Sequence, residues 1–301
     1  MTTDTAIWRT HAAREIRSQP EAWTRALALL PDVAAALPRR GERVAVIGCG
    51  TSWFMAAAYA GLREAAGQGE TDAFAGSQVP ADRRYDRMVA ISRSGTTTEV
   101  TRAVEASASP VVAIVGVPGT PITDAADDAI VLEFADEQSV VQTVFATTTL
   151  MLLRGSLGAS LEPVVAQAAA ILDAPGPLPA EVEASGQFSF LGQGWVYGIA
   201  QEAALKMREA AQLWTEAYPQ MEYRHGPIAI AQPGRTVWVL GPAVAGLTAD
   251  VSATGAALVD DDLDPVADLV RVQMLAVRRA EAQHLDPDRP RHLTRSVVLA
   301  E

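Results

Sequence analysis

The sequence contains a single lysine, although it has 24 basic side chains, so that 23 of them are arginine. Arginine stays protonated near neutral pH, whereas the ammonium of a desolvated lysine can shift its pKa and take part in proton transfer. The one lysine, Lys206, is therefore either a chance remnant of an arginine-rich composition or a residue selected for chemistry. Its sequence neighbours have to decide between these two interpretations.

Other scarcities exclude whole classes of protein. One cysteine cannot build a disulfide framework, and no apolar run is long enough to span a membrane. No charged and then apolar leader begins the sequence, so we expect a cytoplasmic protein. A formal net charge of −12 disfavours binding to nucleic acid or to an anionic membrane, because such binding draws on an excess of basic residues. The four histidines are scattered, and Cys49 has no partner at metal-ligand spacing, so no metal site is expected.

Short apolar runs alternate with helical patterns in the first half of the chain. Residues 54–66 have the alanine-rich pattern of a helix, and residues 8–30 predict two short helices divided at Pro20. Continuous apolar strands between helices are typical of a parallel sheet that is covered on both faces. The predicted strands of this sheet are residues 44–48, 88–92, 111–115 and 129–132.

The second half of the chain repeats this pattern. Residues 188–195 resemble residues 44–51, since in both a buried strand runs into Gly-x-Gly and then into a helix, with an offset of 144 positions. Two diverged copies of one α/β unit explain the repeat, and a Pro/Gly cluster after residue 172 separates them. The second, shorter copy is completed by an apolar run at 236–241, a helix at 265–282 and the last run, 296–299. The predicted organisation is N-terminal helices at 1–36, a first domain at 37–172, a linker at 173–186 and a second domain with a tail at 187–301.

Two hydroxyl-rich segments follow predicted strands and precede helices. In residues 48–52, Gly-Cys-Gly-Thr-Ser, backbone N–H groups and the helix dipole favour an anion. The segment lacks the third glycine of a dinucleotide site and the Gly-Lys-Ser/Thr of a P-loop, so we expect no nucleotide cofactor. In residues 92–99, hydroxyls and N–H groups can converge on an oxyanion, with Arg93 adding charge. Helix capping is the alternative explanation, but two such segments on one sheet favour a phosphorylated small molecule.

The lone lysine shares a helix face with two glutamates. Glu202, Lys206 and Glu209 lie at positions i, i+4 and i+7. This spacing fits a solvated stripe of ion pairs, and it fits equally a general acid/base pair in a site. Farther along, His225 precedes Gly-Pro, where a turn can present an imidazole to a ligand. A surface histidine is the alternative for this position.

Taken together and in order, these motifs resemble those of the sugar isomerase (SIS) domain family, most closely the isomerase half of glucosamine-6-phosphate synthase. The resemblance runs from Glu15 to the C-terminus and implies two flavodoxin-like, three-layer αβα subdomains with parallel sheets, the second shorter. It also implies a homodimer whose subunits share the active site. The motifs are Cys-Gly-Thr-Ser at 49–52, Ser-Arg-Ser-Gly-Thr-Thr at 92–97, Ala-Leu-Lys-Met-Arg-Glu at 204–209, Glu-Ala-Tyr at 216–218, His-Gly-Pro at 225–227 and a tail motif at 286–293.

The resemblance also implies residue roles. Glu209 would move a proton between C1 and C2 of the sugar, Lys206 would support it, and His225 of the partner subunit would assist ring opening. Val140 would lie near the sugar. The residues implied around the sugar phosphate are Cys49, Gly50, Thr51, Ser52, Ser92, Arg93, Ser94 and Thr97.

Two departures from the family pattern limit the carry-over. The sequence has no glutaminase domain with its N-terminal cysteine nucleophile, so glutamine-dependent synthesis is not expected. The family's tail lysine, which forms an imine with the open ketose, corresponds to Arg295, and an arginine cannot form that imine near neutral pH. Arg295 is instead expected to bind phosphate or to close the site over the substrate.

We therefore expect an enzyme that abstracts the C2 proton of an amino-sugar 6-phosphate through Glu209. Isomerisation, with or without loss of ammonia, is the first expectation. A dehydratase that eliminates the C3 hydroxyl of an N-acetylated amino-sugar phosphate and a fructosamine-phosphate deglycase are alternatives. A non-catalytic sugar-phosphate sensor is a further one, although sensors usually carry a DNA-binding helix-turn-helix and no basic N-terminal domain precedes the predicted sheet.

Overall fold

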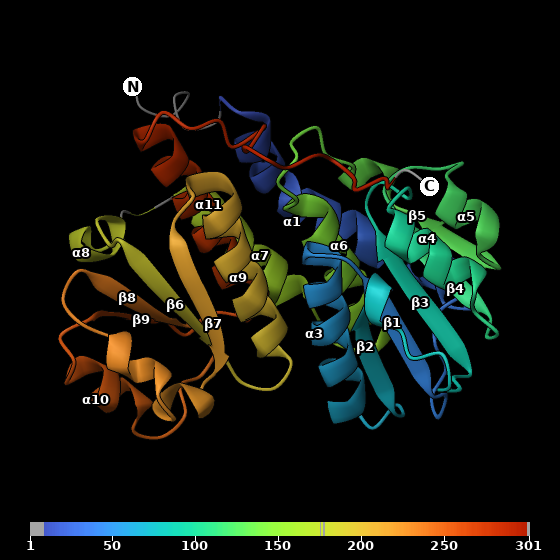
Figure 1. Ribbon diagram of the computed structural model, residues 1–301, viewed down its shortest axis with the longest axis horizontal. Helices are drawn as coiled ribbons and strands as arrows, with labels where there is room; N and C mark the ends of the chain where they lie inside the picture. Colours follow the sequence, from blue (N-terminus) through green and yellow to red (C-terminus); the bar gives the residue numbers. More distant parts are fainter. Residues whose placement is uncertain (1–8, 175, 177, 300–301) are drawn as a thin grey trace. The chain divides into compact units, whose positions relative to one another are not determined.

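The computed structural model describes residues 9–174, 176 and 178–299. Contacts divide them into two compact units. The first unit comprises residues 18–162 together with 292–299, and the second comprises residues 9–17 together with the described part of 163–291. Each unit contains one parallel sheet (Figure 1).

The first unit contains a five-stranded parallel sheet with the flavodoxin-like strand order β2-β1-β3-β4-β5. The central strands β1, β3 and β4 are almost wholly buried, as their continuous apolar sequences predict. The strands are β1 Val44–Gly48, β2 Thr71–Ala75, β3 Arg87–Ser92, β4 Val111–Val115 and β5 Asp128–Val131.

Helices cover this sheet. Val100 and Val104 of α4 and Ile122 of α5 pack into an apolar cluster with side chains of β1, β3 and β4, while α3 contacts β1 and β2 and packs against α6. The helices are α1 His11–Ala28, α2 Leu30–Val33, α3 Thr51–Ala65, α4 Thr98–Glu105, α5 Pro121–Ala125 and α6 Val144–Ser156, with short 3₁₀ turns η1 Gly76–Gln78 and η2 Glu133–Ala135.

The second unit contains a four-stranded parallel sheet in the order β7-β6-β8-β9. Helices α9 and α11 pack extensively against each other, and α9 also contacts β6 and β7. The strands are β6 Gln187–Gly192, β7 Trp214–Pro219, β8 Arg235–Val239 and β9 Ala257–Asp260. The helices are α7 Glu162–Asp173, α8 Ala180–Glu183, α9 Val196–Ala211, α10 Leu247–Ser252 and α11 Pro265–Ala282, with 3₁₀ turns η3 Glu222–Arg224 and η4 Pro227–Ile230.

The predicted break at Pro20 is wrong. Helix α1 continues from His11 to Ala28 with Pro20 inside it. A proline within a helix costs about 3 kcal/mol, but Trp23 and Ala26 on the following turns are fully buried, and their packing offsets that cost. Trp8, where the sequence predicted this region to begin, lies outside the described residues.

The two ends of the chain do not follow the predicted division by sequence. Residues 9–17 belong to the second unit, where the carboxylate of Asp288 accepts hydrogen bonds from the first backbone N–H groups of α1, at His11 and Ala12. The run 296–299, predicted to complete the second copy, lies in the first unit and is not a strand. Positions 175 and 177 of the predicted linker lie outside the described residues.

A buried carboxyl in α11 makes stability depend on pH. Asp268 is fully buried and accepts a hydrogen bond from the Trp238 indole at 2.8 Å. Burial raises its pKa to about 6, although Trp238 and Arg271 act in the opposite direction. The folded state therefore holds this proton at pH values where the unfolded chain has lost it, so stability falls as pH rises from about 4 to about 6.

We expect the free energy of unfolding of the second unit to fall by up to about 3 kcal/mol over that interval because of Asp268. Asp268→Asn keeps an acceptor for Trp238 and removes the titration. Urea unfolding at several pH values between 4 and 7 should give a flatter profile for this variant than for the parent. Asp250→Asn, at an exposed carboxylate of the same unit that pairs with Arg224, is the matched control. Parallel profiles for the parent and Asp268→Asn would contradict the assignment.

Candidate functional site

The predicted site residues fall into two groups, one in each unit. The first group surrounds the carboxyl ends of β1 and β3. Gly48 ends β1, and a Cβ at this position would lie 2.6 Å from the backbone carbon of Ser52, so the turn into α3 needs glycine. Gly50 has φ +54, and Thr51 and Ser52 are buried in the first turn of α3. The predicted strand, tight turn and helix are therefore confirmed here.

In the loop between β3 and α4, serine hydroxyls accept hydrogen bonds from backbone N–H groups of the same loop. Ser92 Oγ accepts a hydrogen bond from the Gly95 N–H at 3.2 Å, and Ser94 Oγ accepts from the Thr96 N–H at 3.2 Å and lies 3.1 Å from the Thr96 hydroxyl oxygen. Gly95 has φ +66 and lies so close to Thr120 that a Cβ would overlap its hydroxyl. The loop is thus a compact group of hydroxyls at the start of a helix, which is a favourable setting for an anion.

A tail residue joins this group of hydroxyls, and the sequence did not predict it. Ser296 Oγ accepts hydrogen bonds from the hydroxyls of Thr96 at 2.9 Å and Ser94 at 3.1 Å, and it lies 3.5 Å from Thr97 Oγ1. We call Ser94, Thr96, Thr97 and Ser296 the hydroxyl cluster. Its members come from positions about 200 residues apart in the chain.

Arg93 is buried beside the cluster and contacts backbone carbonyls. Its guanidinium donates to the carbonyl oxygens of Ser139 at 2.9 Å, Val140 at 3.2 Å and Arg295 at 3.1 Å. It also lies 3.7 Å from the carboxylate of Glu137, with 1% and 0% of the two side chains exposed. Arg93 therefore connects the β3 loop to two other segments, and its predicted direct contact with phosphate stays a prediction.

The partner of Arg93 is itself held at a helix start. Glu137 Oε1 accepts from the Val144 N–H at 2.8 Å and from the Thr143 hydroxyl at 2.9 Å, so it caps the N-terminus of α6. Sequence reasoning missed Glu137. Val140, predicted near the sugar, lies in the segment that Glu137 and Arg93 fix between them.

Two further predicted residues are Arg295, which precedes Ser296 of the cluster, and Cys49, which follows β1. Arg295 donates through its guanidinium to the Glu137 carbonyl and the Asp136 carboxylate, so the structure places it on the same segment as Val140. Cys49 is partly buried, and burial raises the pKa of its thiol. The thiol is therefore uncharged at pH 7.

The second group lies on α9 in the second unit. Gly192 allows the tight turn before α9, because a Cβ there would lie 2.3 Å from the Val196 carbonyl oxygen. On α9 the Lys206 ammonium is 2.6 Å from Glu209 Oε2 and 3.3 Å from Glu202 Oε1. The sequence-predicted shared face is confirmed, and the surface-stripe alternative is not, since 1% of the Lys206 side chain is exposed.

Burial differs between the two carboxylates. The Glu202 side chain is 1% exposed, whereas that of Glu209 is 19% exposed. A buried cation between two carboxylates leaves the trio with one net negative charge, and Glu209 is the member that a ligand can reach. This arrangement can hold a base in a fixed rotamer and accept a proton at Glu209.

His225 lies in the same unit at the end of η3 and is exposed. The predicted origin of the site histidine in a partner subunit stays a prediction. Among the described residues, no group of three or more His, Cys, Asp or Glu side chains could hold a metal ion.

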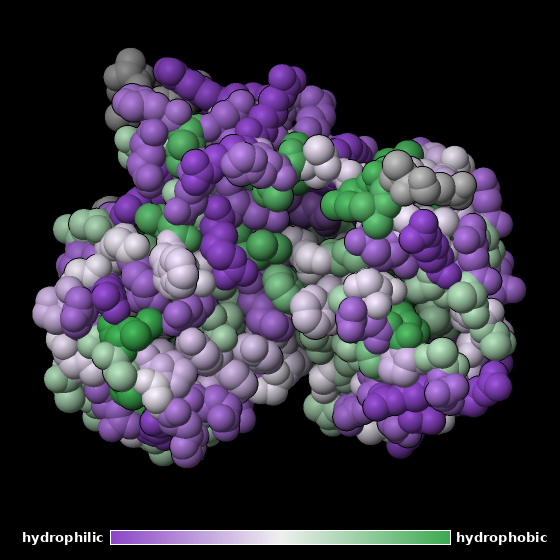
Figure 2. Space-filling view, in the orientation of Figure 1, coloured by the Kyte–Doolittle hydropathy of each residue, from purple (hydrophilic) through white to green (hydrophobic). Residues whose placement is uncertain are grey.

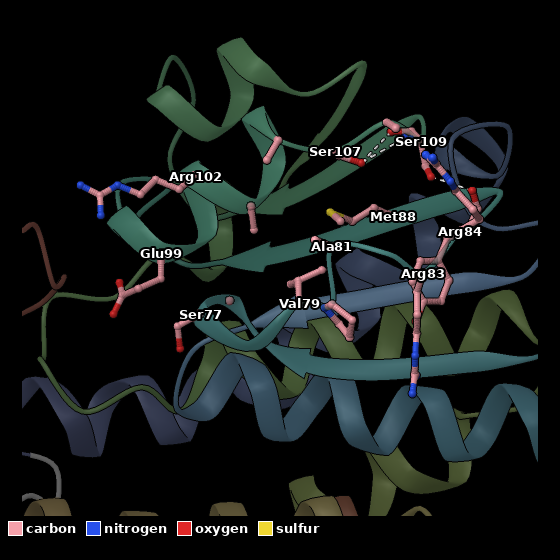
Figure 3. A pocket seen from close by; sticks show the side chains of 16 residues that line it. Ser77, Val79, Ala81, Arg83, Arg84, Met88, Glu99, Arg102, Ser107 and Ser109 are labelled. Atoms are coloured by element: carbon pink, nitrogen blue, oxygen red, sulfur yellow. Dashed lines mark hydrogen bonds between the residues drawn. The ribbon is translucent and has the colours of Figure 1, made fainter.

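A cavity of about 420 Å³ lies in the first unit beside α4, but it contains none of the predicted site residues. The connection between β2 and β3 has only the short turn η1, and the cavity lies where a covering helix is missing. Figure 3 shows the Arg83 and Arg102 side chains extending away from Met88 in different directions, so its charged groups do not converge on a ligand. The hydroxyl cluster remains the candidate anion site of this unit.

Several known structures share this fold. The chain superposes on a glucosamine-6-phosphate deaminase from Thermotoga maritima with a TM-score of 0.80 and 23% identity, covering 96% of this chain and 100% of that one. A tagatose-6-phosphate ketose/aldose isomerase from Escherichia coli gives a TM-score of 0.78 at 20% identity, covering 100% and 98%. The fold is therefore the double SIS fold of phosphosugar isomerases, as predicted.

Sequence relatives carry a more particular name. The chain is 28% identical to a glutamine–fructose-6-phosphate aminotransferase (isomerizing) from Gloeobacter violaceus, over 86% of this chain and 52% of that protein. The counterpart from Methanothermobacter thermautotrophicus is 27% identical, over 95% and 57%. The chain thus spans about half the length of the curated relatives it matches. No protein-family model matches the chain. None of the described helices is long and apolar enough to cross a bilayer.

Proposed function

We propose that the protein processes an amino-sugar 6-phosphate by abstracting the proton at C2, with Glu209 as the base. The observation that carries this proposal is the buried Lys206 ammonium, 2.6 Å from a partly exposed Glu209 and 3.3 Å from a buried Glu202. Relatives named as phosphosugar isomerases and a deaminase support the substrate class.

In the proposed reaction, the substrate opens to the aldehyde with the assistance of His225. The Glu209 carboxylate takes the C2 proton, and the electron pair passes to the carbonyl to give an enolic intermediate. Glu209 returns the proton to C1 while one proton passes from the C2 amine to the C1 oxygen, which yields the 2-imino sugar from an amino sugar, and water then releases ammonia and the ketose phosphate. Lys206 holds the Glu209 carboxylate in place and offsets its charge.

The sugar phosphate is proposed to bind in the first unit at the ends of β1 and β3. Backbone N–H groups at the start of α3 and hydroxyls of the β3 loop are the proposed hydrogen-bond donors to the phosphate, in a chain whose net charge is negative. The proposed ligands are Cys49, Gly50, Thr51, Ser52, Ser92, Ser94 and Thr97, with Val140 near the sugar and Arg295 closing the site.

A dehydratase is the second candidate. The only side-chain primary amine of the sequence is engaged by two carboxylates, and a dehydration, like the reaction above, needs no lysine imine. If the C3 hydroxyl leaves as water after C2 deprotonation, an N-acetylated sugar phosphate gives an unsaturated product.

A homodimer is part of the proposal. Val297, Val298 and Leu299 of the tail are among the most exposed large apolar side chains, and Figure 2 shows apolar surface beside the C-terminal end. An apolar patch of this kind is typical of a surface that a partner covers. In the proposed dimer the second copy supplies His225, as the resemblance to the SIS family implies.

Product analysis tests the proposal. The purified protein is incubated with glucosamine 6-phosphate and, separately, with N-acetylglucosamine 6-phosphate. Fructose 6-phosphate with ammonia identifies the isomerase/deaminase, and ultraviolet absorbance of an unsaturated product identifies the dehydratase. Turnover of fructosamine phosphates alone would identify a deglycase. If the protein binds the sugars without any turnover, it is a sensor and the proposed enzyme is refuted.

A further inference from the structure

The C-terminal tail is fixed along the β3 loop by its backbone on both sides of Ser296. The Thr98 N–H, at the start of α4, donates to the Val297 carbonyl at 3.1 Å, and the Leu299 N–H donates to the Thr98 hydroxyl at 2.9 Å. Before Ser296, the Arg295 carbonyl accepts from Arg93 at 3.1 Å. The tail is therefore anchored at both sides of this one serine.

Ser296 lies where the proposed phosphate ligands meet. Its Oγ is 3.1 Å from Ser94 Oγ and 3.5 Å from Thr97 Oγ1, and both of these hydroxyls are proposed phosphate ligands. A phosphate that reaches both hydroxyls must lie against the Ser296 hydroxyl as well. Ser296 must then either leave or become a ligand itself.

The contacts favour the second possibility. Leaving would break the backbone hydrogen bonds at Arg295, Val297 and Leu299, whereas a hydroxyl can turn its hydrogen from one acceptor to another within a single rotamer. A serine hydroxyl that donates to a phosphate oxygen makes a charge-assisted hydrogen bond. Binding as a ligand thus leaves the tail backbone in place.

Arg93 holds the tail and the sugar segment together. Its buried guanidinium touches the carbonyls of Val140 and Arg295, and Glu137 faces it with an equally buried carboxylate. The two carbonyl contacts fix backbone, so the proposed effect of Arg93 on a ligand is exerted through the positions of other residues.

We propose that Ser296 is a further phosphate-binding residue of the site and that Arg93 is the positioning residue that holds Ser296 there. The proposal rests on the phosphate site of the proposed function, but it does not depend on turnover. It assigns the ligand class as a phosphate monoester or inorganic phosphate, bound by hydroxyls and the start of α4.

Ser296→Ala tests the first half of the proposal. Binding of inorganic phosphate to the purified protein is measured by isothermal titration calorimetry, and the KM for glucosamine 6-phosphate is measured where turnover is found. We expect phosphate binding about tenfold weaker and KM raised by a similar factor, with kcat nearly unchanged. Thr294→Ala removes another hydroxyl of the same tail, which donates to the Ser296 carbonyl and not to the hydroxyl cluster, and should leave both values unchanged.

Unchanged or tighter phosphate binding by a folded Ser296→Ala variant would overturn the assignment, because tighter binding would mean that Ser296 competes with the ligand. The outcomes also separate the two proposals. Phosphate binding that depends on Ser296 without turnover of any sugar would refute the enzyme and keep this inference. Turnover of a sugar phosphate together with phosphate binding that does not depend on Ser296 would keep the enzyme and refute this inference.

Arg93→Lys tests the second half, since it keeps the charge but cannot reach several carbonyls at once. If Arg93 acts through Ser296, the double variant Arg93→Lys/Ser296→Ala should bind phosphate as tightly as whichever of the two single variants has the lower affinity. Fully additive losses would mean that Arg93 contacts phosphate directly, which would overturn its positioning role. Should Arg93→Lys fail to fold, that failure refutes a role limited to ligand positioning, and the Ser296→Ala comparison still decides the first half.

Discussion

Glu209→Gln is expected to lower kcat about 10³-fold with the best amino-sugar phosphate, because the amide keeps the shape of the side chain but cannot accept the C2 proton. The amide oxygen can still accept the hydrogen bond from Lys206, which is 2.6 Å from the carboxylate in the parent protein. The KM should change little, since Glu209 is not among the proposed phosphate ligands. Steady-state kinetics together with solvent-deuterium incorporation at C2 measures the effect.

Glu222→Gln is the matched control for this prediction. It makes the same chemical change at an exposed glutamate of the same unit and should leave kcat within about twofold of the parent value. Solvent-exchange at C2 that persists undiminished in Glu209→Gln would assign the base to another residue.

The central strands could be predicted from the sequence, whereas three of the four edge strands could not. β1, β3, β4, β6 and β8 are continuous apolar runs because each has neighbours on both sides and helices on both faces. The strands that the sequence did not predict are β2, β7 and β9, and all three lie at sheet edges. Residues such as Asp72 in β2 and Glu216 in β7 interrupt their apolar pattern, since an edge strand is partly exposed.

The acidic pair around Lys206 could be predicted because it is local. A period of 3.6 residues places Glu202 and Glu209 on the same helix face as Lys206 without any knowledge of the fold. Its burial, which separates a functional trio from a surface stripe, depends on the packing of α9 against α11 and could not be read from the sequence.

The contacts of the tail could not be predicted for the opposite reason. Ser296 is 202 residues from Ser94, and its apolar neighbours at 297–299 have the pattern of a short strand. Arg93 likewise has a sequence environment that suggests phosphate binding, while its actual partners are carbonyl groups near Val140 and in the tail. Long-range hydrogen bonds of this kind leave no periodic signal in the chain.

The second large effect is expected at Lys206, where Lys206→Met should destabilise the second unit by about 3–5 kcal/mol. The substitution removes the cation that faces both carboxylates, and Glu202 is 1% exposed, so its charge would stay in an apolar setting. Turnover should also fall at least 100-fold, because Glu209 loses the group that fixes its rotamer. Urea unfolding and steady-state kinetics on the same preparation measure both losses.

The double variant Lys206→Met/Glu202→Leu separates the two losses. Removing the buried carboxylate together with its partner replaces a buried ion pair by apolar side chains, which is often neutral for stability. We expect most of the free energy of unfolding to return while kcat remains low, since Glu209 still lacks the ammonium 2.6 Å away. If kcat returned together with stability, Lys206 would be needed only for folding. The scarcity of lysine in the sequence would then have no connection with the chemistry of the site.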